Sequence, residues 1–165
     1  NGKYMKKKAV FLDRDGVINK EVGDYIKKLE DFELLPHIFE GLKMLQDAGY
    51  LLIVITNQGG IAKAEYSRDA MRSMHSFMNL ELNSRGIQID AIYYCPHHPI
   101  KSNCLCRKPN SIMVEKAIGK FNIDPLQSYF IGDKQRDIDC GNAVGVKGFL
   151  IEPNENWVPL IQNII

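Results

Sequence analysis

Five short apolar runs recur along the chain, and their pattern is the feature that most limits the possible folds. They are continuously hydrophobic and do not alternate between apolar and polar residues, as expected of parallel strands covered on both faces. The five runs are AVFLD (9–13), LLIVIT (51–56), IDAIYY (89–94), SYFIGD (128–133) and VKGFLI (146–151).

Segments with helical periodicity lie between these runs. They cover residues 38–50, 67–86, 111–121 and 136–145, and the second opens on Ser67, a good N-cap, and closes before Gly86. Strand–helix alternation predicts an α/β fold: one doubly wound, Rossmann-like domain with a central parallel sheet of about five strands and helices on both faces. We expect residues 1–165 to form this single domain, with residues 1–4 preceding a native start at Met5.

Charge and hydropathy exclude several classes of partner. The chain has 165 residues, enough to bury a substantial core, and its 21 Lys and Arg residues against 20 Asp and Glu residues give a net charge of +1. Such a balance attracts neither nucleic acid nor a membrane surface. Neither a signal peptide nor a transmembrane run of about twenty apolar residues occurs in the sequence. We therefore expect a cytoplasmic monomer.

Carboxylates stand where two of the predicted strands end. Asp13 and Asp15 close the first run, and Asp133 closes the fourth. The carboxyl ends of parallel strands share one edge of the sheet, so these groups should face one pocket. Buried carboxylates are costly unless they are paired or bind a metal, and hard oxygen ligands suit Mg²⁺. The alternative is that Asp13 and Asp15 merely form a turn before Gly16.

Other polar residues at the same edge can bind phosphate. Thr56 ends the second run and leads into a glycine-rich turn at residues 57–60, and Lys108 supplies a positive charge. Each could be a plain turn or a surface lysine if taken alone. Together with the carboxylates they indicate phosphoryl transfer, in which Asp13 acts as nucleophile and Asp15 as general acid and base. The expected substrate is a small phosphorylated metabolite.

Three of the four cysteines crowd into one segment with histidine. Cys95, Cys104 and Cys106 with one histidine make a set suited to tetrahedral Zn²⁺, and both His97 and His98 are available as that ligand. Such a filled shell predicts a structural zinc-binding loop over residues 95–108, in a reducing compartment. Cys140 lies in a predicted helix and is expected to serve in packing.

The order of these motifs resembles the haloacid dehalogenase superfamily of phosphatases. Its four motifs match Asp13-x-Asp15-Gly16, Thr56, Lys108 and Gly132-Asp133-Lys134-x-x-Asp137. The resemblance implies an aspartyl-phosphate intermediate on Asp13 and Mg²⁺ held by Asp13, the backbone carbonyl of Asp15, and Asp133.

The zinc loop, which ends in Cys-Arg-Lys-Pro, resembles a subgroup of that superfamily with two activities. One removes the C7 phosphate of D-glycero-D-manno-heptose 1,7-bisphosphate, and TNQGGIAKAEY and GDKQRD favour it; the other hydrolyses histidinol phosphate, and the tail PNENWVPLI is similar to that enzyme. The resemblance favours His97 as the zinc ligand and Arg107 as the contact to the second, distal phosphate or to the sugar. The substrate contacts it implies are Glu21, Val22, Gly23, Asp24, Asn57, Gln58, Gly59, Arg107 and Lys134.

Two other classes of protein share parts of this pattern. A phosphoacceptor signalling domain also uses a strand-end Asp, a Thr and a Lys, but Asp15 is suited to rapid hydrolysis of the acyl phosphate that such a domain must preserve. A zinc-stabilised binding module would not need every catalytic position to be filled. No long insertion that could fold as a cap domain lies between Gly16 and Thr56 or between Thr56 and Lys108, so we expect an open site.

Overall fold

The structure is a computed structural model that describes residues 5–165, and the residues expected to precede a native start at Met5 lie outside the described part. Within residues 5–165 the strands form one five-stranded parallel sheet in the order β3-β2-β1-β4-β5. The strands are β1 (Ala9–Leu12), β2 (Leu51–Asn57), β3 (Ala91–Cys95), β4 (Tyr129–Gly132) and β5 (Lys147–Leu150).

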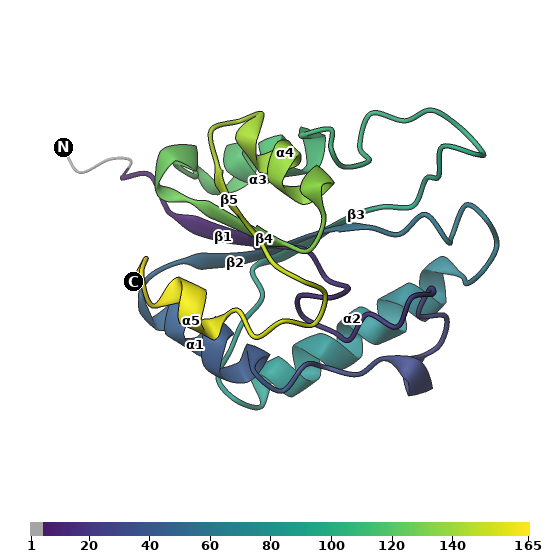
Figure 1. Cartoon of the computed structure of the whole chain (residues 1–165), viewed down its shortest axis with the longest axis horizontal. Helices are drawn as coiled ribbons and strands as arrows, with labels where there is room; N and C mark the ends of the chain where they lie inside the picture. The colour runs from purple at the N-terminus through teal and green to yellow at the C-terminus, as the bar shows by residue number, and fades with distance from the viewer. Residues whose placement is uncertain (1–4) are drawn as a thin grey trace.

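Helices cover both faces of the sheet, as the sequence predicts. In Figure 1, α3 and α4 lie on one face, and α1, α2 and α5 lie on the other. Ser67 caps α2 as expected, since its side chain accepts a hydrogen bond from the Ala70 N–H at 3.0 Å. The helices are α1 (Ile38–Asp47), α2 (Arg68–Asn83), α3 (Ile112–Phe121), α4 (Gln135–Asn142) and α5 (Val158–Ile161), with short 3₁₀ helices at Leu29–Asp31 and Pro125–Gln127.

The five predicted strands are confirmed, with ends that differ from the predicted ones by at most two residues. β3 starts two residues later than expected because the Asp90 side chain accepts the Leu52 N–H at 2.8 Å and so takes the place of a strand partner. β5 is an edge strand whose residues Lys147 and Leu150 are exposed, so it is not covered on both faces. The central strand β1 fits the expectation fully: all four of its residues are buried.

The sheet separates two apolar cores. One packs β1 and β2 residues against α1, α2 and the segment after β5, and the other packs the opposite strand faces against α3 and α4. Trp157, just before the unpredicted helix α5, is fully buried in the first core, where its indole N–H donates to the Val17 carbonyl at 2.9 Å. The C-terminal segment is therefore an integral part of that core.

Irregular segments lie over the carboxyl ends of the strands. Residues 13–37 follow β1, and residues 96–111 extend from β3 on the right of Figure 1. No further domain is inserted between the strands of the described residues, in agreement with the expected absence of a large cap. Among residues 5–165, no helix is long and apolar enough to span a membrane.

Candidate active site

A cavity of about 420 Å³ opens where the strands end. Asp13 directly follows β1, Asp133 directly follows β4, and Lys108 reaches them from the segment after β3. The sequence-predicted residues that line this cavity are Asp13, Asp15, Glu21, Gly23, Asp24, Asn57, Gln58, Lys108, Asp133 and Lys134.

Four other predicted residues are not part of that lining. Thr56 is fully buried behind it, and its hydroxyl accepts a hydrogen bond from Gln58 Nε2 at 2.9 Å. Val22 lines a separate surface pocket and is 56% exposed. Gly59 lies against the zinc loop next to Arg107, and the guanidinium of Arg107 donates to the His97 carbonyl within that loop at 3.3 Å.

Lys108 joins two carboxylates in a buried ionic group. Its Nζ lies 2.9 Å from Asp13 Oδ1 and 2.7 Å from Asp137 Oδ1, and it also donates to the Ile55 carbonyl at 2.6 Å. Burial alone would lower the pKa of Lys108, but these two carboxylates raise it. Burial raises the pKa of Asp13 to about 8, against the opposing effect of Lys108 and with the help of the neighbouring carboxylates. Asp13 thus needs further positive charge to remain ionised at neutral pH.

The Asp133 carboxylate has the features of a cation ligand. Both of its oxygens are buried and have no hydrogen-bond partner among the described residues. Carboxylate oxygens of Asp13, Asp133 and Asp137 lie within 4.8 Å of one another. Gly16 makes this possible, because a Cβ at that position would lie 2.3 Å from Asp133 Oδ2. Unpaired oxygens in such a cluster fit a hard divalent ion such as Mg²⁺.

Asp15 is held by three hydrogen-bond donors. Its Oδ1 accepts from Arg14 at 2.7 Å and from the Asn19 amide at 2.9 Å, and its Oδ2 accepts from Gln58 Nε2 at 3.2 Å. Burial acts to raise the pKa of Asp15, but the Arg14 charge and these hydrogen bonds outweigh it and lower the pKa. Two adjacent carboxylates, Asp13 and Asp15, therefore have pKa values shifted in opposite directions.

Sequence reasoning missed several residues of the site. Asp137 ends the motif that begins at Gly132, but the sequence alone gives it no role. In the structure it binds Lys108 and accepts the Lys134 backbone N–H at 3.1 Å. Arg136 lines the cavity next to Lys134, and its place one residue before Asp137 at the start of α4 is the signal that could have indicated this. Tyr66 also lines the cavity, but no local pattern distinguishes it from a core tyrosine.

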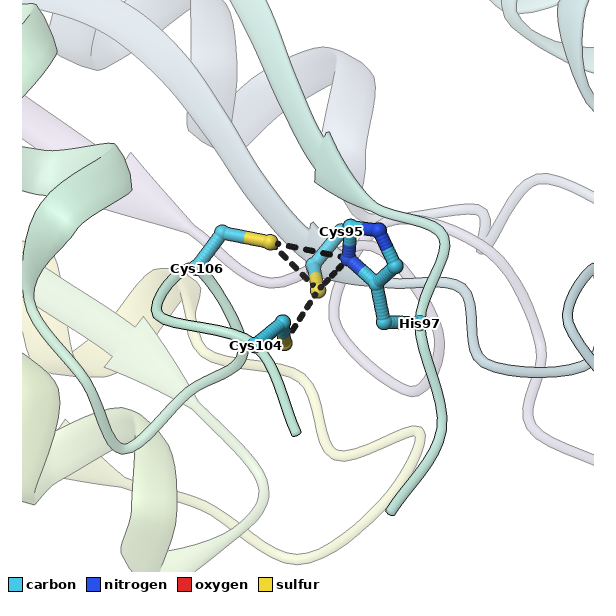
Figure 2. Close-up of side chains that lie close together, drawn as sticks. All are labelled: Cys95, His97, Cys104 and Cys106. Carbon is cyan, nitrogen blue, oxygen red and sulfur yellow. Dashed lines mark hydrogen bonds between the residues drawn. The ribbon is translucent and has the colours of Figure 1, made fainter. Parts of the chain in front are cut away.

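The predicted zinc ligands lie together beyond the end of β3. Figure 2 shows Cys95, His97, Cys104 and Cys106 with their side chains pointing toward one another, and their ligand atoms lie within 4.8 Å of each other. A tetrahedral zinc site separates its sulfur and nitrogen ligands by about 3.5–3.8 Å. The Cys95–Cys104 sulfurs are 3.6 Å apart and Cys95 Sγ is 3.5 Å from His97 Nδ1, whereas the Cys95–Cys106 sulfurs are closer, at 2.8 Å.

The choice between the two histidines follows from their hydrogen bonds. His98 is not part of the cluster of ligand atoms, and its Nδ1 accepts the Ile100 N–H at 3.2 Å. His97 is thus the histidine that completes the four-residue cluster. The same segment is tied to β2, because the Asn57 side chain accepts the Lys108 N–H at 3.0 Å and donates to the Lys108 carbonyl at 3.3 Å. The cysteine cluster and the buried lysine therefore lie on one braced loop.

The strand ends of this parallel α/β sheet bring together two aspartates, a buried lysine and a further pair of carboxylates. This combination of fold and site defines a hydrolase of the haloacid dehalogenase (HAD) class. A sequence model of the HAD-hydrolase-like family matches residues 105–156. The solved structure of a D,D-heptose 1,7-bisphosphate phosphatase from B. bronchiseptica, complexed with magnesium and phosphate, superposes with a TM-score of 0.84 at 28% identity, over 94% of this chain and 86% of that one.

Curated relatives narrow the class further. The D-glycero-beta-D-manno-heptose-1,7-bisphosphate 7-phosphatase of Haemophilus ducreyi is 44% identical, covering 87% of this chain and 81% of the relative. The D-glycero-alpha-D-manno-heptose-1,7-bisphosphate 7-phosphatase of Photorhabdus laumondii is 41% identical, covering 94% and 92%. The chain belongs to this family of HAD phosphatases, the D-glycero-D-manno-heptose-1,7-bisphosphate 7-phosphatases.

Proposed function

We propose that this protein is a Mg²⁺-dependent phosphatase that removes the C7 phosphate of D-glycero-D-manno-heptose 1,7-bisphosphate. The observation that carries the proposal is the buried group of Asp13, Lys108 and Asp133 at the base of an open cavity. Asp13 lies beside the fixed positive charge of Lys108 and near Asp133, whose oxygens are unpaired among residues 5–165. This arrangement is suited to receive a phosphate together with a metal. The substrate for which the relatives are named, together with Lys134 and Arg136 in the cavity lining, supports a sugar that carries two phosphates.

Mg²⁺ would be held by Asp13, the Asp15 backbone carbonyl and Asp133, with Asp137 in reach of the same group. When bound, it supplies positive charge that offsets the repulsion between an anionic nucleophile and a phosphate dianion. Lys108 contributes a second fixed charge on the other side of Asp13. Asn57, at the end of β2, lines the site, and Thr56 lies buried behind the lining.

The reaction then takes two steps on this chain's own side chains. In the first, an Asp13 carboxylate oxygen attacks phosphorus, the bond from phosphorus to the C7 oxygen breaks, and the departing oxygen takes a proton from Asp15. The hydrogen bonds to Asp15 lower its pKa in the free site, so Asp15 would take up this proton as the phosphate dianion binds beside it, because a neighbouring negative charge favours the protonated carboxyl. In the second, Asp15 accepts a proton from water as that water attacks the phosphorus of the Asp13 acyl phosphate. Inorganic phosphate leaves, and the Asp13 carboxylate and the protonated Asp15 are restored.

The rim of the cavity supplies groups for the rest of the substrate. Glu21 and Asp24 can bind sugar hydroxyls, while Lys134 and Arg136 form a basic side suited to the second phosphate. Arg107 remains a candidate for that phosphate from the zinc-loop side. The Cys95, His97, Cys104 and Cys106 cluster would hold structural Zn²⁺, which requires reduced thiols and so supports a cytoplasmic location.

Two measurements test the proposal. The chain should release phosphate from heptose 1,7-bisphosphate only with Mg²⁺ present, and Asp13→Asn should abolish turnover. Arg85→Gln, just beyond the end of α2 and outside the cavity lining, should not change turnover. A stable phosphoprotein that does not turn over would instead indicate a phosphoacceptor domain. A higher kcat/KM for histidinol phosphate than for the heptose bisphosphate would replace the proposed substrate with the alternative one.

A further inference from the structure

His75, a buried histidine with no role in the proposed reaction, is linked to the general acid Asp15 through one intervening side chain, that of Arg14. His75 is on α2, is 8% exposed, and its Nε2 lies 3.3 Å from Arg14 Nη1. Because a guanidinium has no acceptor, Arg14 donates and the His75 Nε2 must be unprotonated. The ring is therefore a neutral imidazole that acts as a hydrogen-bond acceptor.

Arg14 transmits this contact to the reaction site. Its side chain is almost fully buried, and Asp15 is its one carboxylate partner among the described residues, at 2.7 Å. The ring of Phe32 lies 5.3 Å from the guanidinium carbon, which restricts the plane of the group. A buried guanidinium with one carboxylate needs further acceptors, and His75 supplies one of them.

The second oxygen of Asp15 is supported in a parallel way. The Tyr66 hydroxyl donates to Gln58 Oε1, and Gln58 in turn donates to Asp15 Oδ2 at 3.2 Å. Tyr66 is itself fixed, because its ring packs against Tyr25 and fills the space beside Gly60, where a Cβ would lie 2.3 Å away. Tyr66 immediately precedes Ser67, the N-cap of α2, so one support of Asp15 lies on α2 and the other lies just before its start.

We propose that His75 and Tyr66 are positioning residues, which hold the two oxygens of Asp15 through Arg14 and Gln58 in the orientation that delivers a proton to the leaving oxygen. This inference rests on the proposed function. General acid catalysis contributes about 10²–10⁴-fold, and only where the leaving group needs a proton. Loss of positioning should therefore affect alkyl phosphates, whose leaving oxygen is strongly basic, far more than aryl phosphates.

The test compares kcat/KM for heptose 1,7-bisphosphate and for p-nitrophenyl phosphate, because this parameter reports the step that releases the leaving group. His75→Leu and Tyr66→Phe should each lower it for the heptose bisphosphate by about 10–100-fold, and by less than about threefold for the aryl ester. His75→Gln, whose side-chain carbonyl can accept from Arg14, should recover most of the loss.

A purely structural role predicts a different outcome. Equal loss on both substrates, or no loss on either, overturns the inference while leaving the phosphatase assignment intact. The assignment itself fails instead if Asp13→Asn retains turnover. If His75→Leu does not fold, Tyr66→Phe decides the matter, since it removes one hydroxyl and leaves the packed ring in place.

Discussion

At the scale of single residues, the contact between Gly16 and Asp133 leaves no space for a side chain at position 16. Gly16 has φ +85°, and an added Cβ would lie 2.3 Å from Asp133 Oδ2. We expect Gly16→Ala to displace this carboxylate and to weaken Mg²⁺-dependent activity by about 10–100-fold. A magnesium titration of phosphate release measures the effect.

Gly86→Ala is the matched control for backbone strain. Gly86 has φ +73° with no atom within 4 Å of the added Cβ, and it lies between α2 and β3, away from the cavity. Both variants should lose about 1–2 kcal/mol of folding stability, but Gly86→Ala should keep its response to Mg²⁺. An equal response of the two variants would contradict a metal-ligand role for Asp133.

A second residue-scale prediction concerns the pH dependence of stability. Burial, followed by the charge of Arg14, lowers the pKa of His75 from 6.5 to about 4. The unfolded chain therefore binds a proton more readily than the folded one between these values, so stability is full above pH 6.5 and falls as the pH drops toward 4. The loss from this group reaches about 3 kcal/mol.

Urea unfolding at pH 7 and pH 4.5 checks this value. His75→Gln does not titrate at this position, so its free energy of unfolding should fall less than that of the wild type between the two pH values. The aspartates and glutamates are the same in both proteins, so their contribution cancels in the comparison. Parallel losses in the two proteins would show that His75 does not titrate with a lowered pKa.

At the scale of elements, the loop at residues 95–108 links the cluster of Cys95, His97, Cys104 and Cys106 to the candidate active site. Cys106 lies two residues before Lys108, whose backbone is clamped by the Asn57 side chain. Cys106→Ser should lose its zinc, loosen this segment and lower phosphatase activity by at least about tenfold. Metal analysis of the purified protein, with activity measured on the same sample, gives both readouts.

Cys140 offers the matched control for that substitution. It is buried on α4, donates to the Asn110 carbonyl at 3.3 Å, and lies outside the cluster. Cys140→Ser should keep both the zinc and the activity. A wild-type protein that contains no zinc, or a Cys140→Ser variant that loses as much as Cys106→Ser, would contradict the assigned ligands.

The elements also show where sequence reasoning reaches its limit. Strands β1, β2 and β4 were predictable because buried parallel strands are apolar throughout, and Asp13 and Asp133 were predictable because they end such strands. The residues that support Asp15, His75 and Tyr66, could not be predicted. Their contacts join residues up to 61 positions apart, and no local sequence pattern marks them. The start of β3 was misplaced for a similar reason, since it depends on a hydrogen bond between Asp90 and Leu52.

At the scale of the whole molecule, the C-terminal segment braces the loop that follows β1. Its sequence suggested only a resemblance to the histidinol enzyme, yet Asn154 lies beside Glu21 across the fold. The Asn154 side chain accepts the Glu21 N–H at 2.7 Å and donates to the Glu21 carbonyl at 2.9 Å, and its own N–H donates to the Gly16 carbonyl at 2.8 Å. Trp157 anchors this segment in the core below Val17.

This bracing predicts a change in substrate binding caused by a residue outside the cavity lining. Asn154 has φ +68°, so Asn154→Gly keeps the backbone conformation and removes both side-chain hydrogen bonds to Glu21. The loop that carries Glu21 and Asp24 should then order only on binding, which raises KM for the heptose bisphosphate about tenfold and leaves kcat within about threefold. Asn122→Gly, at another left-handed asparagine that ends α3 far from the site, should leave both constants unchanged. If the two variants have the same KM, the loop at residues 21–24 does not depend on the C-terminal segment for its order.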